Sequence, residues 1–471
     1  MNQDKELARQ QTWAAIDLLE SLGFLVNYNK SVLDPVQEIV FLGFVLNSIA
    51  KEVRLPQQKL SQIQREARQL LSQNQVSARA LASFIGKLSA AILAIYPAPL
   101  HYRSLQQLKH KALRVSGFDG LMAISPPAQE DLEWWIKNLG NWNGRTIQHV
   151  APEMEIETDA SKMGWEAYCM GDFTGGCWSQ EEKTLHINAL ELIAATFGVQ
   201  AFCKHRKVTS VLLKSDNATV VAYVNKMGGT KSPLLTQLVK ELWQWCLQRH
   251  IHLRAQHLPG KLNFTADFLS RHLQDRSDWI LDQELFSMIN STLGPLDIDL
   301  FATRFSTRLP RFVSWCPDPM AEATDALLQD WTTFTGYAHP PWCLISRVLF
   351  KVQSQMATLV VVVPLWQTQA WFPQLLQMLI DIPILLPQQP GIVEPSPNCD
   401  CPMMSNLPQL IVCKVSGCAS KQKEFQKRLL TSSWHPGDQK PKLIMTLHGG
   451  NGRPGVHQRI PIPLQQIYPS F

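Results

Sequence analysis

Long apolar runs are absent from this chain of 471 residues. Its most apolar stretch, residues 357–365, is nine residues long and contains Pro364, whereas a bilayer-spanning helix needs about 20 apolar residues. The first residues, Met-Asn-Gln-Asp-Lys-Glu, also lack the charged tip and apolar run of a secretory signal. We therefore expect an intracellular protein, in the cytoplasm or the nucleus, with no membrane partner.

A dense cysteine framework and a strong charge imbalance are absent too. The ten cysteines are scattered, so we interpret them as reduced thiols. The spacing of Cys399, Cys401, Cys413 and Cys418 matches no zinc knuckle. Lys and Arg total 44 against 39 Asp and Glu, a net charge of +5, which alone does not establish a polyanionic partner. The length suggests roughly two to four globular α/β domains.

Two segments have the pattern of a buried strand that ends in an acid. Residues 154–159 alternate between apolar or small and acidic side chains and end at Asp159, which is the period of a strand with one covered face. Residues 208–216 form a second strand pattern, which ends at Asp216. An acid in this position can be held rigidly, although a solvated turn residue is the commoner explanation of a single one.

Between these segments the sequence predicts a hairpin and then a helix. Residues 164–170 and 173–179 indicate two strands joined at Gly171-Asp172. The helix that follows carries Glu191 between leucines, where a carboxylate costs free energy unless it is paired, bound to a metal or turned outward. A buried Glu191 paired with a nearby lysine is the simplest alternative to a functional role.

A fourth acid, Asp267, follows a loop that begins at His257 and opens a short helix. If the four acids converge, they cannot all stay ionised without cations, because neighbouring like charges raise one another's pKa. Mg²⁺ or Mn²⁺ prefers such oxygen ligands, and two ions about 3.5 to 4 Å apart can support phosphodiester hydrolysis. The sequence therefore predicts a site for two divalent cations at Asp159, Glu191, Asp216 and Asp267.

The segment 51–117 has a basic and helical pattern. Leu60, Ile63, Ala67, Leu70 and Leu71 keep helical spacing, and residues 76–94 indicate a second helix. Only two acids, Glu52 and Glu66, accompany eleven basic residues: Lys51, Arg54, Lys59, Arg65, Arg68, Arg79, Lys87, Arg103, Lys109, Lys111 and Arg114. This charge predicts a phosphate-backbone partner, with a solvated helix face as the alternative.

Tryptophans mark the connector over residues 121–150. Trp134, Trp135 and Trp142 could stack on bases. Packing into a protein core is the favoured explanation, because tryptophan is usually buried.

Four stretches near the start carry a family resemblance. They are residues 22–31 (LGFLVNYNKS), 41–44 (FLGF), 81–89 (LASFIGKLS) and 99–103 (PLHYR). Together they resemble the end of the palm and the thumb of reverse transcriptases from DIRS-type retroelements. The Tyr-x-Asp-Asp turn and the upstream Asp of that family would precede the first residue. We therefore expect no polymerase activity from this chain, and we interpret it as a truncated copy or a fragment of a longer product.

The four acids resemble, in order, the metal ligands of retroelement ribonuclease H. They lie in Thr-Asp159-Ala-Ser, Leu-Glu191-Leu, Ser-Asp216-Asn and Thr-Ala-Asp267-Phe-Leu-Ser. The resemblance implies a mixed five-stranded sheet with flanking helices. It also implies two Mg²⁺ or Mn²⁺ ions and cleavage of the RNA strand of an RNA/DNA hybrid, which leaves a 3′-hydroxyl and a 5′-phosphate.

Further residues are candidates for contacts with nucleic acid. Asn188 and Asn217 could contact 2′-hydroxyls, and His257 could assist proton transfer or product release. Lys87 and Arg103 lie in the thumb-like motifs. Other proteins of the same retroelement would be further partners.

The C-terminal part has strand patterns rich in Val, Ile and Leu, covering residues 296–302, 336–342, 357–364 and 382–387. This pattern is typical of strands covered on both faces. Asp299-Leu-Phe-Ala and His339-Pro-Pro-Trp resemble the cofactor loop and the catalytic motif of the methyltransferase-like region in DIRS-type elements. Glycines are missing after Ala302, and His339 replaces the usual Asp or Asn, so methyl transfer is not expected.

The resemblance divides the chain into six predicted parts. They are the palm end (1–50), a basic thumb-like segment (51–120), the connector (121–150), a ribonuclease H-like domain (151–275), a degenerate methyltransferase-like α/β domain (280–430) and a poorly ordered tail (431–471). Residues from about 388 already have a tail-like composition. The alternatives to a nuclease are an inert relic that only binds nucleic acid and a DNA methyltransferase that binds S-adenosylmethionine.

Overall fold

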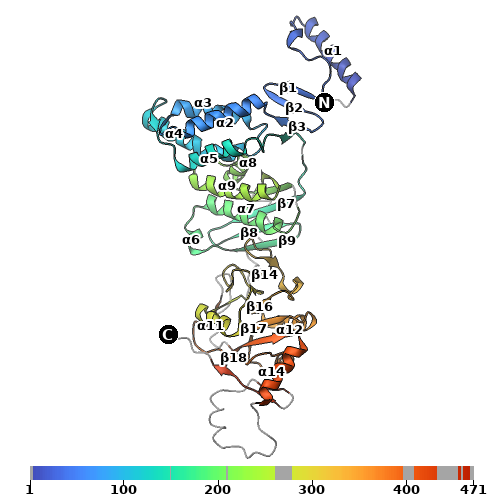
Figure 1. Ribbon diagram of the computed structural model, residues 1–471, viewed down its shortest axis with the longest axis vertical. Coiled ribbons are helices and arrows are strands. Elements are labelled where there is room, and N and C mark those ends of the chain that lie inside the picture. The colour runs from blue at the N-terminus through green and yellow to red at the C-terminus, as the bar shows by residue number, and fades with distance from the viewer. Residues whose placement is uncertain are drawn as a thin grey trace, which may run out of the picture. The chain divides into compact units, whose positions relative to one another are not determined.

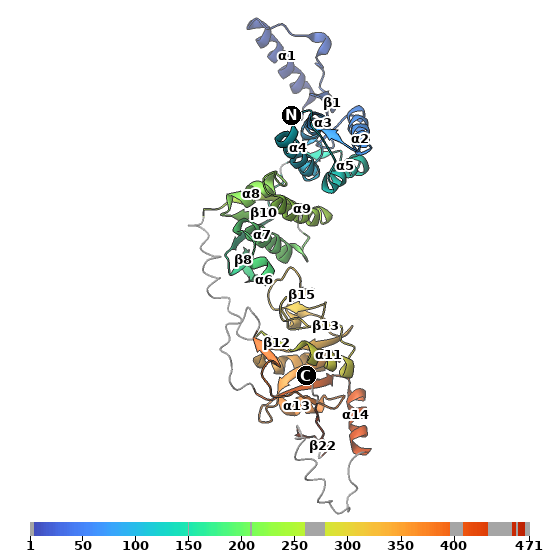
Figure 2. The same ribbon diagram turned by 90° about the vertical axis from the view of Figure 1, so that its left-hand side faces the viewer.

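The computed structural model describes residues 4–148, 150–207, 210–259, 278–395, 408–431, 455–457 and 460–466 (Figures 1 and 2). The chain forms two compact units. One unit consists of Met1–Pro152 with Ala222–Leu253, and the other of Glu153–Val221 with Arg254–Phe471. The six predicted domain boundaries remain a prediction.

The first unit begins with a helix and a small antiparallel sheet of order β1-β2-β3-β6. Its elements are α1 (Lys5–Ser21), η1 (Tyr28–Lys30), β1 (Glu38–Phe41), β2 (Phe44–Asn47), β3 (Glu52–Arg54) and β6 (Arg145–Thr146). Residues 38–47 form an antiparallel hairpin of β1 and β2. Leu42 and Gly43 form its turn, with φ of 47° and 78°, and positive φ at both residues matches the twist of hairpin strands.

A helical bundle follows, as the apolar spacing predicts. It contains α2 (Gln57–Leu71), β4 (Val76–Ser77), α3 (Ala78–Ala91), η2 (Ala98–His101), α4 (Arg103–Ser116), β5 (Leu121–Met122) and α5 (Pro126–Asn138). Leu60, Ile63, Ala67 and Leu70 face the bundle core from α2. The short helix η1 is capped by Asn27, whose side chain accepts a hydrogen bond from the Lys30 amide.

The connector tryptophans pack into protein, as predicted. Trp135 is fully buried, and its indole N–H donates to the carbonyl of His101 at 2.7 Å. Trp134 stacks on the His101 ring, with the ring centroids 3.9 Å apart. Trp142 packs against the same core. These three side chains therefore stabilise the bundle.

The predicted mixed five-stranded sheet is confirmed, with order β11-β10-β7-β8-β9. Its strands are β7 (Met154–Ala160), β8 (Gly164–Cys169), β9 (Asp172–Cys177), β10 (Ser210–Ser215) and β11 (His252–His257). The helices between them are α6 (Gln180–Lys183), α7 (Ile187–Cys203), α8 (Ala218–Asn225) and α9 (Pro233–Gln248). Strands β7, β8 and β9 are antiparallel neighbours, whereas β10 is parallel to β7.

The hairpin turn lies one residue earlier than predicted. Strand β8 ends at Cys169 and β9 begins at Asp172, so Met170 and Gly171 form the turn. Their φ values are 52° and 96°. Asp172 is the first strand residue and opposes Cys169.

The C-terminal part of the second unit contains a six-stranded sheet of order β13-β16-β17-β20-β18-β23. Its strands are β13 (Ile298–Asp299), β16 (Thr335–Ala338), β17 (Thr358–Pro364), β18 (Ile384–Leu385), β20 (Leu410–Ser416) and β23 (Gln465–Gln466). Strands β13, β16 and β17 are parallel to one another, and β17 is antiparallel to β20.

Helices and short strands surround this sheet. They are β12 (Trp279–Leu281), α11 (Gln283–Leu293), β14 (Val313–Ser314), β15 (Ala323–Thr324), η4 (Ala326–Leu328), η5 (Trp342–Leu344), α12 (Ile345–Ser354), α13 (Phe372–Gln377), β19 (Val393–Pro395), α14 (Ala419–Thr431), β21 (Gly455–His457) and β22 (Ile460–Ile462). Among the described residues, no helix is both long enough and apolar enough to span a membrane.

The expectation of disorder from about residue 388 is wrong for the two elements between residues 410 and 431. Strand β20 is a central strand of the six-stranded sheet, and its Cys413 is fully buried. Helix α14 follows it, and Phe425 and Leu429 of that helix join the same core. Cys399 and Cys401 lie outside the described residues.

Candidate metal centre

Two neighbouring parallel strands bring two acids to one edge of the five-stranded sheet. In the register of β10 and β7, Lys214 pairs with Glu157. Two residues further along, Asp216 follows the end of β10 at the level of Asp159 in β7. The carboxyl ends of both strands therefore present a carboxylate at the same place.

Helix α7 supplies the third acid. His186 caps the start of this helix, and its ring accepts a hydrogen bond from the Asn188 amide at 3.1 Å. Glu191 and Gly198 are seven residues apart and share one helix face. A Cβ atom at position 198 would lie 2.9 Å from side-chain carbons of both Thr158 and Ala167. Because residue 198 is glycine, α7 lies close enough to the sheet for Glu191 to reach its edge.

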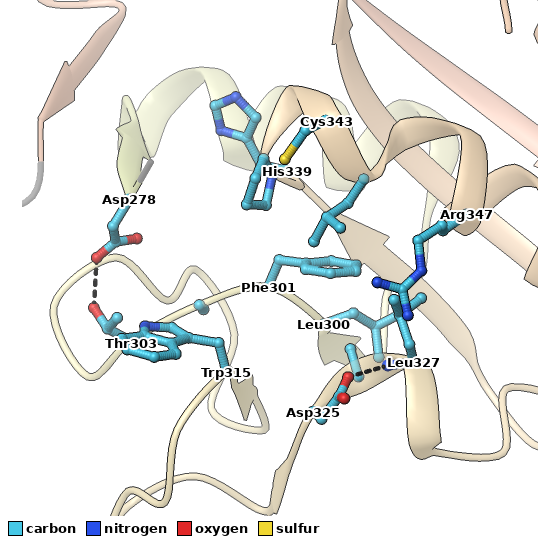
Figure 3. Close-up of a pocket in the computed structure, with 14 residues that line it drawn as sticks. Asp278, Leu300, Phe301, Thr303, Trp315, Asp325, Leu327, His339, Cys343 and Arg347 are labelled. Carbon is cyan, nitrogen blue, oxygen red and sulfur yellow. Dashed lines mark hydrogen bonds between the residues drawn. The ribbon is translucent and has the colours of Figure 1, made fainter. Parts of the chain in front are cut away.

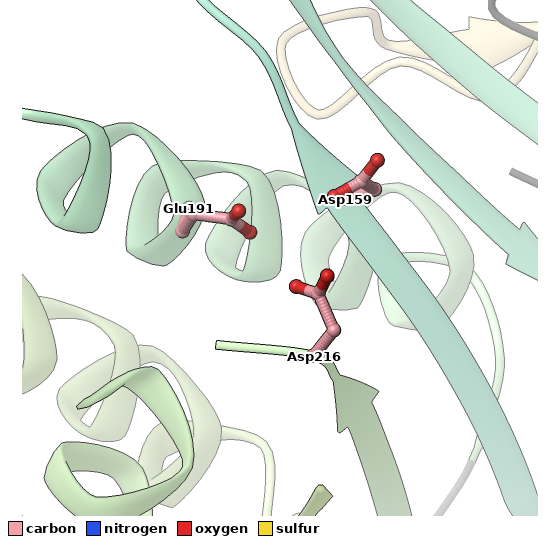
Figure 4. Close-up of side chains that lie close together, drawn as sticks. All are labelled: Asp159, Glu191 and Asp216. Carbon is pink, nitrogen blue, oxygen red and sulfur yellow. The ribbon is translucent and has the colours of Figure 1, made fainter. Parts of the chain in front are cut away.

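Asp159, Glu191 and Asp216 each offer an oxygen within 4.8 Å of the others (Figure 4). This set is the one group of potential metal ligands found among the described residues. Three of the four predicted ligands thus come together in the structure. Asp267 lies outside the described residues, so its place stays a prediction.

The electrostatics of Glu191 favour a bound cation. Glu191 is 5% exposed, and its Oε2 has no hydrogen-bond partner within the described part of the chain. Burial, and then the charges of Asp159 and Asp216, raise the pKa of Glu191 to about 8. Without a metal, this carboxyl therefore holds a proton at neutral pH, and a divalent cation would take the place of that proton.

The two predicted asparagines lie beside these acids and bind each other. The side-chain amide of Asn217 donates to Oδ1 of Asn188 at 3.0 Å. Oδ1 of Asn217 accepts hydrogen bonds from the backbone amides of Thr219 and Val220 at 2.9 and 3.2 Å, which caps the start of α8. The pair is fixed next to the carboxylates, and its contact with ribose stays a prediction.

His257 lies exposed at the end of β11. The amide of the next residue, Leu258, donates to the carbonyl of Ser215 at 3.0 Å. Since Asp216 follows Ser215, His257 is near the edge that carries the carboxylates. Its role in proton transfer stays a prediction.

The two predicted cations of the thumb-like segment contact other protein groups. Lys87 lies 2.7 Å from Oε2 of Glu66. The guanidinium of Arg103 donates to the carbonyl of Lys226 and lies 5.1 Å from the ring centroid of Tyr102. Burial lowers the pKa of Arg103. Lys111 and Arg114 on α4 are exposed and are more accessible to a phosphate.

Sequence reasoning missed Gly198. Its signal was an isolated glycine within an otherwise apolar helix pattern, which often marks a close approach of the backbone to another element. The distance to Thr158 and Ala167 supplies the reason for the glycine.

Comparison with known proteins finds distant similarity to a viral polyprotein. No protein-family model matches the chain. A stretch of 149 residues, 29% of this chain, is 26% identical to the enzymatic polyprotein of figwort mosaic virus (strain DxS). The match spans only 21% of the length of that polyprotein.

Solved structures with some likeness include two kinds of enzyme. The foamy viral protease-reverse transcriptase in complex with RNA/DNA hybrid is 12% identical, with a TM-score of 0.29 over 54% of this chain and 34% of that one. Ribonuclease H1 of Halobacterium salinarum NRC-1 is 16% identical, with a TM-score of 0.21 over 25% of this chain and 92% of that one.

Proposed function

We propose that residues 151–275 form a ribonuclease H that hydrolyses the RNA strand of RNA/DNA hybrids with two Mg²⁺ or Mn²⁺ ions. The observation that carries this proposal is the convergence of Asp159, Glu191 and Asp216 within 4.8 Å at one edge of a mixed five-stranded sheet. The order of these acids along the chain supports the same assignment, because it matches the motifs of retroelement ribonuclease H.

The residues present fit a hard divalent cation. All three side chains offer carboxylate oxygens, and one buried oxygen of Glu191 has no other described partner. Asp159, Glu191 and Asp216 would hold the ions, with Asp267 as the proposed fourth ligand. Bound ions of this kind activate a water molecule and stabilise the leaving oxygen of a phosphodiester.

The side chains of the protein would hold the carboxylates in place, contact the substrate and transfer protons. The rigid strand ends fix Asp159 and Asp216, and the close packing of α7 fixes Glu191. The Asn188–Asn217 pair would lie against the ribose of the RNA strand. His257 would carry a proton near the end of β11.

The test is cleavage of a labelled RNA/DNA hybrid by the purified full chain in Mg²⁺. Asp159→Asn and Asp216→Asn should each abolish cutting. Asp172→Asn is the matched control, because Asp172 is an exposed acid on the same sheet that pairs with Arg206 at 3.3 Å. Activity should persist in this control. Absence of cutting by the wild-type chain would contradict the proposal and favour the inert relic. Equal cutting by the wild-type chain and all variants would contradict the assignment of Asp159 and Asp216 to catalysis.

A further inference from the structure

A pocket of about 540 Å³ lies in the six-stranded part of the second unit (Figure 3). Residues that directly follow two parallel strands line it. They are 300–303 after β13, and His339, Pro341, Cys343 and Leu344 after β16. The carboxyl ends of parallel strands are the usual ligand position in open α/β sheets, and the volume is within the range of small-molecule sites.

The floor of the pocket is apolar. It contains Leu300, Phe301, Leu327 and Leu344. Leu300 belongs to the buried core, and Phe301 and Leu327 pack against that core, so the floor is built on rigid elements. Figure 3 shows the Phe301 ring in the middle of the pocket. A flat, apolar ring system fits such a surface.

A cation and an acid lie together on one side of the pocket in Figure 3. Arg347 on α12 is exposed, and its guanidinium makes no ion pair or hydrogen bond with any described residue. It can therefore receive an anion. Asp325 follows β15, and its Oδ1 accepts a hydrogen bond from the Leu327 amide at 2.9 Å, which leaves Oδ2 to accept from a ligand.

The backbone of Asp325 is strained. Its φ and ψ are 56° and 98°, a region that non-glycine residues rarely occupy. Such strain is maintained only where the surroundings enforce it, and it is concentrated at functional sites. It places the carboxylate of Asp325 at the pocket.

We propose that this pocket binds a nucleotide, with its base on the floor beside Phe301, its ribose hydroxyls donating to Asp325 and its phosphate on Arg347. A ligand must combine a flat ring, hydrogen-bond donors and an anion to use all three features. A fatty acid lacks the donors and a sugar phosphate lacks the ring. An adenosyl sulfonium compound meets the three requirements with a carboxylate in place of the phosphate, so its binding without that of any nucleotide is the rival outcome of the test. This inference is independent of the metal centre.

The nucleotide could be free or could be the end of a strand. A second hollow along α12 shares Leu327 and Arg347 with the pocket and continues to Phe350 and Lys351. Phe350 is 69% exposed. These side chains would receive the next nucleotide of a strand, by stacking and by phosphate contact.

The test is isothermal titration calorimetry of the full chain in EDTA with AMP, GMP, CMP and UMP. At least one should bind saturably, and Arg347→Gln should weaken it at least tenfold. Lys427→Gln is the matched control, because it removes one exposed positive charge from α14, and it should leave binding within about twofold. No saturable binding, equal weakening in both variants, or binding of S-adenosylmethionine alone would overturn the proposal.

Asp325→Gly separates a binding role from a structural one. Glycine takes positive φ without cost, so the unfolding temperature should stay about the same. The wild-type chain should bind the ribonucleotide more tightly than its deoxy form, and the variant should lose this preference. A variant that keeps the preference would contradict the assigned role of Asp325.

A 5′-phosphorylated tetraribonucleotide distinguishes a free nucleotide from the end of a strand as the ligand. Binding at least tenfold tighter than the mononucleotide, with loss of that gain in Lys351→Gln, identifies a strand end as the ligand. Equal affinity identifies a free nucleotide. Both results support the nucleotide site, whereas binding of the oligonucleotide that Arg347→Gln leaves unchanged would contradict it.

Discussion

The metal centre and the nucleotide pocket use the same structural position with opposite chemistry. Each lies where two adjacent parallel strands end, β7 and β10 in one sheet and β13 and β16 in the other. The first position gathers three carboxylates within 4.8 Å. The second combines an apolar floor with one arginine, Arg347, and two acids, Asp278 and Asp325. Topology therefore sets where a ligand binds, and the side chains set which ligand it is.

The largest expected effects are losses of cleavage at the metal centre, and Glu191, whose Oε2 has no described hydrogen-bond partner, shares them with Asp159 and Asp216. Glu191→Gln should lower hybrid cleavage by about 10³-fold, because it removes several kcal/mol of metal-based stabilisation. Glu155→Gln is the control, since Glu155 is an exposed acid on β7 that pairs with Lys214 at 2.7 Å. If Glu191→Gln and Glu155→Gln cleave the hybrid at equal rates, Glu191 contributes no more to catalysis than an exposed acid does. Nucleotide binding in the pocket should not change in either variant.

The next largest effect is on the free energy of unfolding. Without metal it should fall as the pH rises, and bound Mg²⁺ should restore it. The pKa of Glu191 is raised from 4.5 to about 8, so its stabilising contribution in EDTA is complete below about pH 4.5 and is lost as the pH rises through 8. The loss should be on the order of 5 kcal/mol, at about 1.36 kcal/mol for each pKa unit. Mg²⁺ should raise the unfolding temperature more at pH 8 than at pH 6. Glu191→Gln should flatten the profile in EDTA, and an unchanged profile would contradict the assignment.

A pair of glycines tests the close packing of α7. Gly198→Ala should destabilise the protein by about 1–3 kcal/mol through overpacking, because its Cβ would lie 2.9 Å from two side-chain carbons. It should also lower cleavage, since Glu191 lies on the same helix face. Gly86→Ala on α3 is the control, since a Cβ there meets nothing within 4 Å. It should stabilise by about 0.5–1 kcal/mol. If both variants change the free energy of unfolding in the same direction, the close packing of α7 against the sheet is contradicted.

The smallest effect concerns the exposed cations of α4. Lys111→Gln and Arg114→Gln should each weaken hybrid binding by less than about tenfold and reduce its salt dependence by about one unit of slope. Fluorescence anisotropy at several salt concentrations measures both quantities. Lys87→Gln should change the slope less, because Lys87 contacts Glu66. If Lys87→Gln changes the salt dependence more than Lys111→Gln and Arg114→Gln do, Lys87 rather than the α4 cations contacts the phosphates.

Much of the five-stranded region could be predicted from sequence. The alternation before Asp159 and the apolar run before Asp216 define strands that end in acids. Helical spacing around Glu191 places a third acid between them. The one-residue error at the hairpin arose because Gly171-Asp172 is a strong turn signal, whereas the structure gives positive φ to Met170, a residue that rarely adopts it.

The six-stranded region was harder to predict. Strand β20 is preceded by a Pro-rich stretch, so composition suggested a tail where the structure has a central strand. The pocket was not predictable either, because Phe301, Asp325 and Arg347 are far apart in sequence and meet only through the crossovers of parallel strands. Local sequence patterns identify strands that end at a charged residue, but they do not identify cavities.

Mn²⁺ titration of the full chain, followed by calorimetry at pH 7 in two buffers of different ionisation enthalpy, tests the metal centre most directly. We predict saturable binding with release of a proton, because a cation replaces the proton on Glu191. Glu191→Gln should lose both the tight binding and the proton release, and Glu155→Gln should keep them. Absence of saturable binding, or binding that Glu191→Gln leaves unchanged, would contradict the assignment of Asp159, Glu191 and Asp216 as metal ligands.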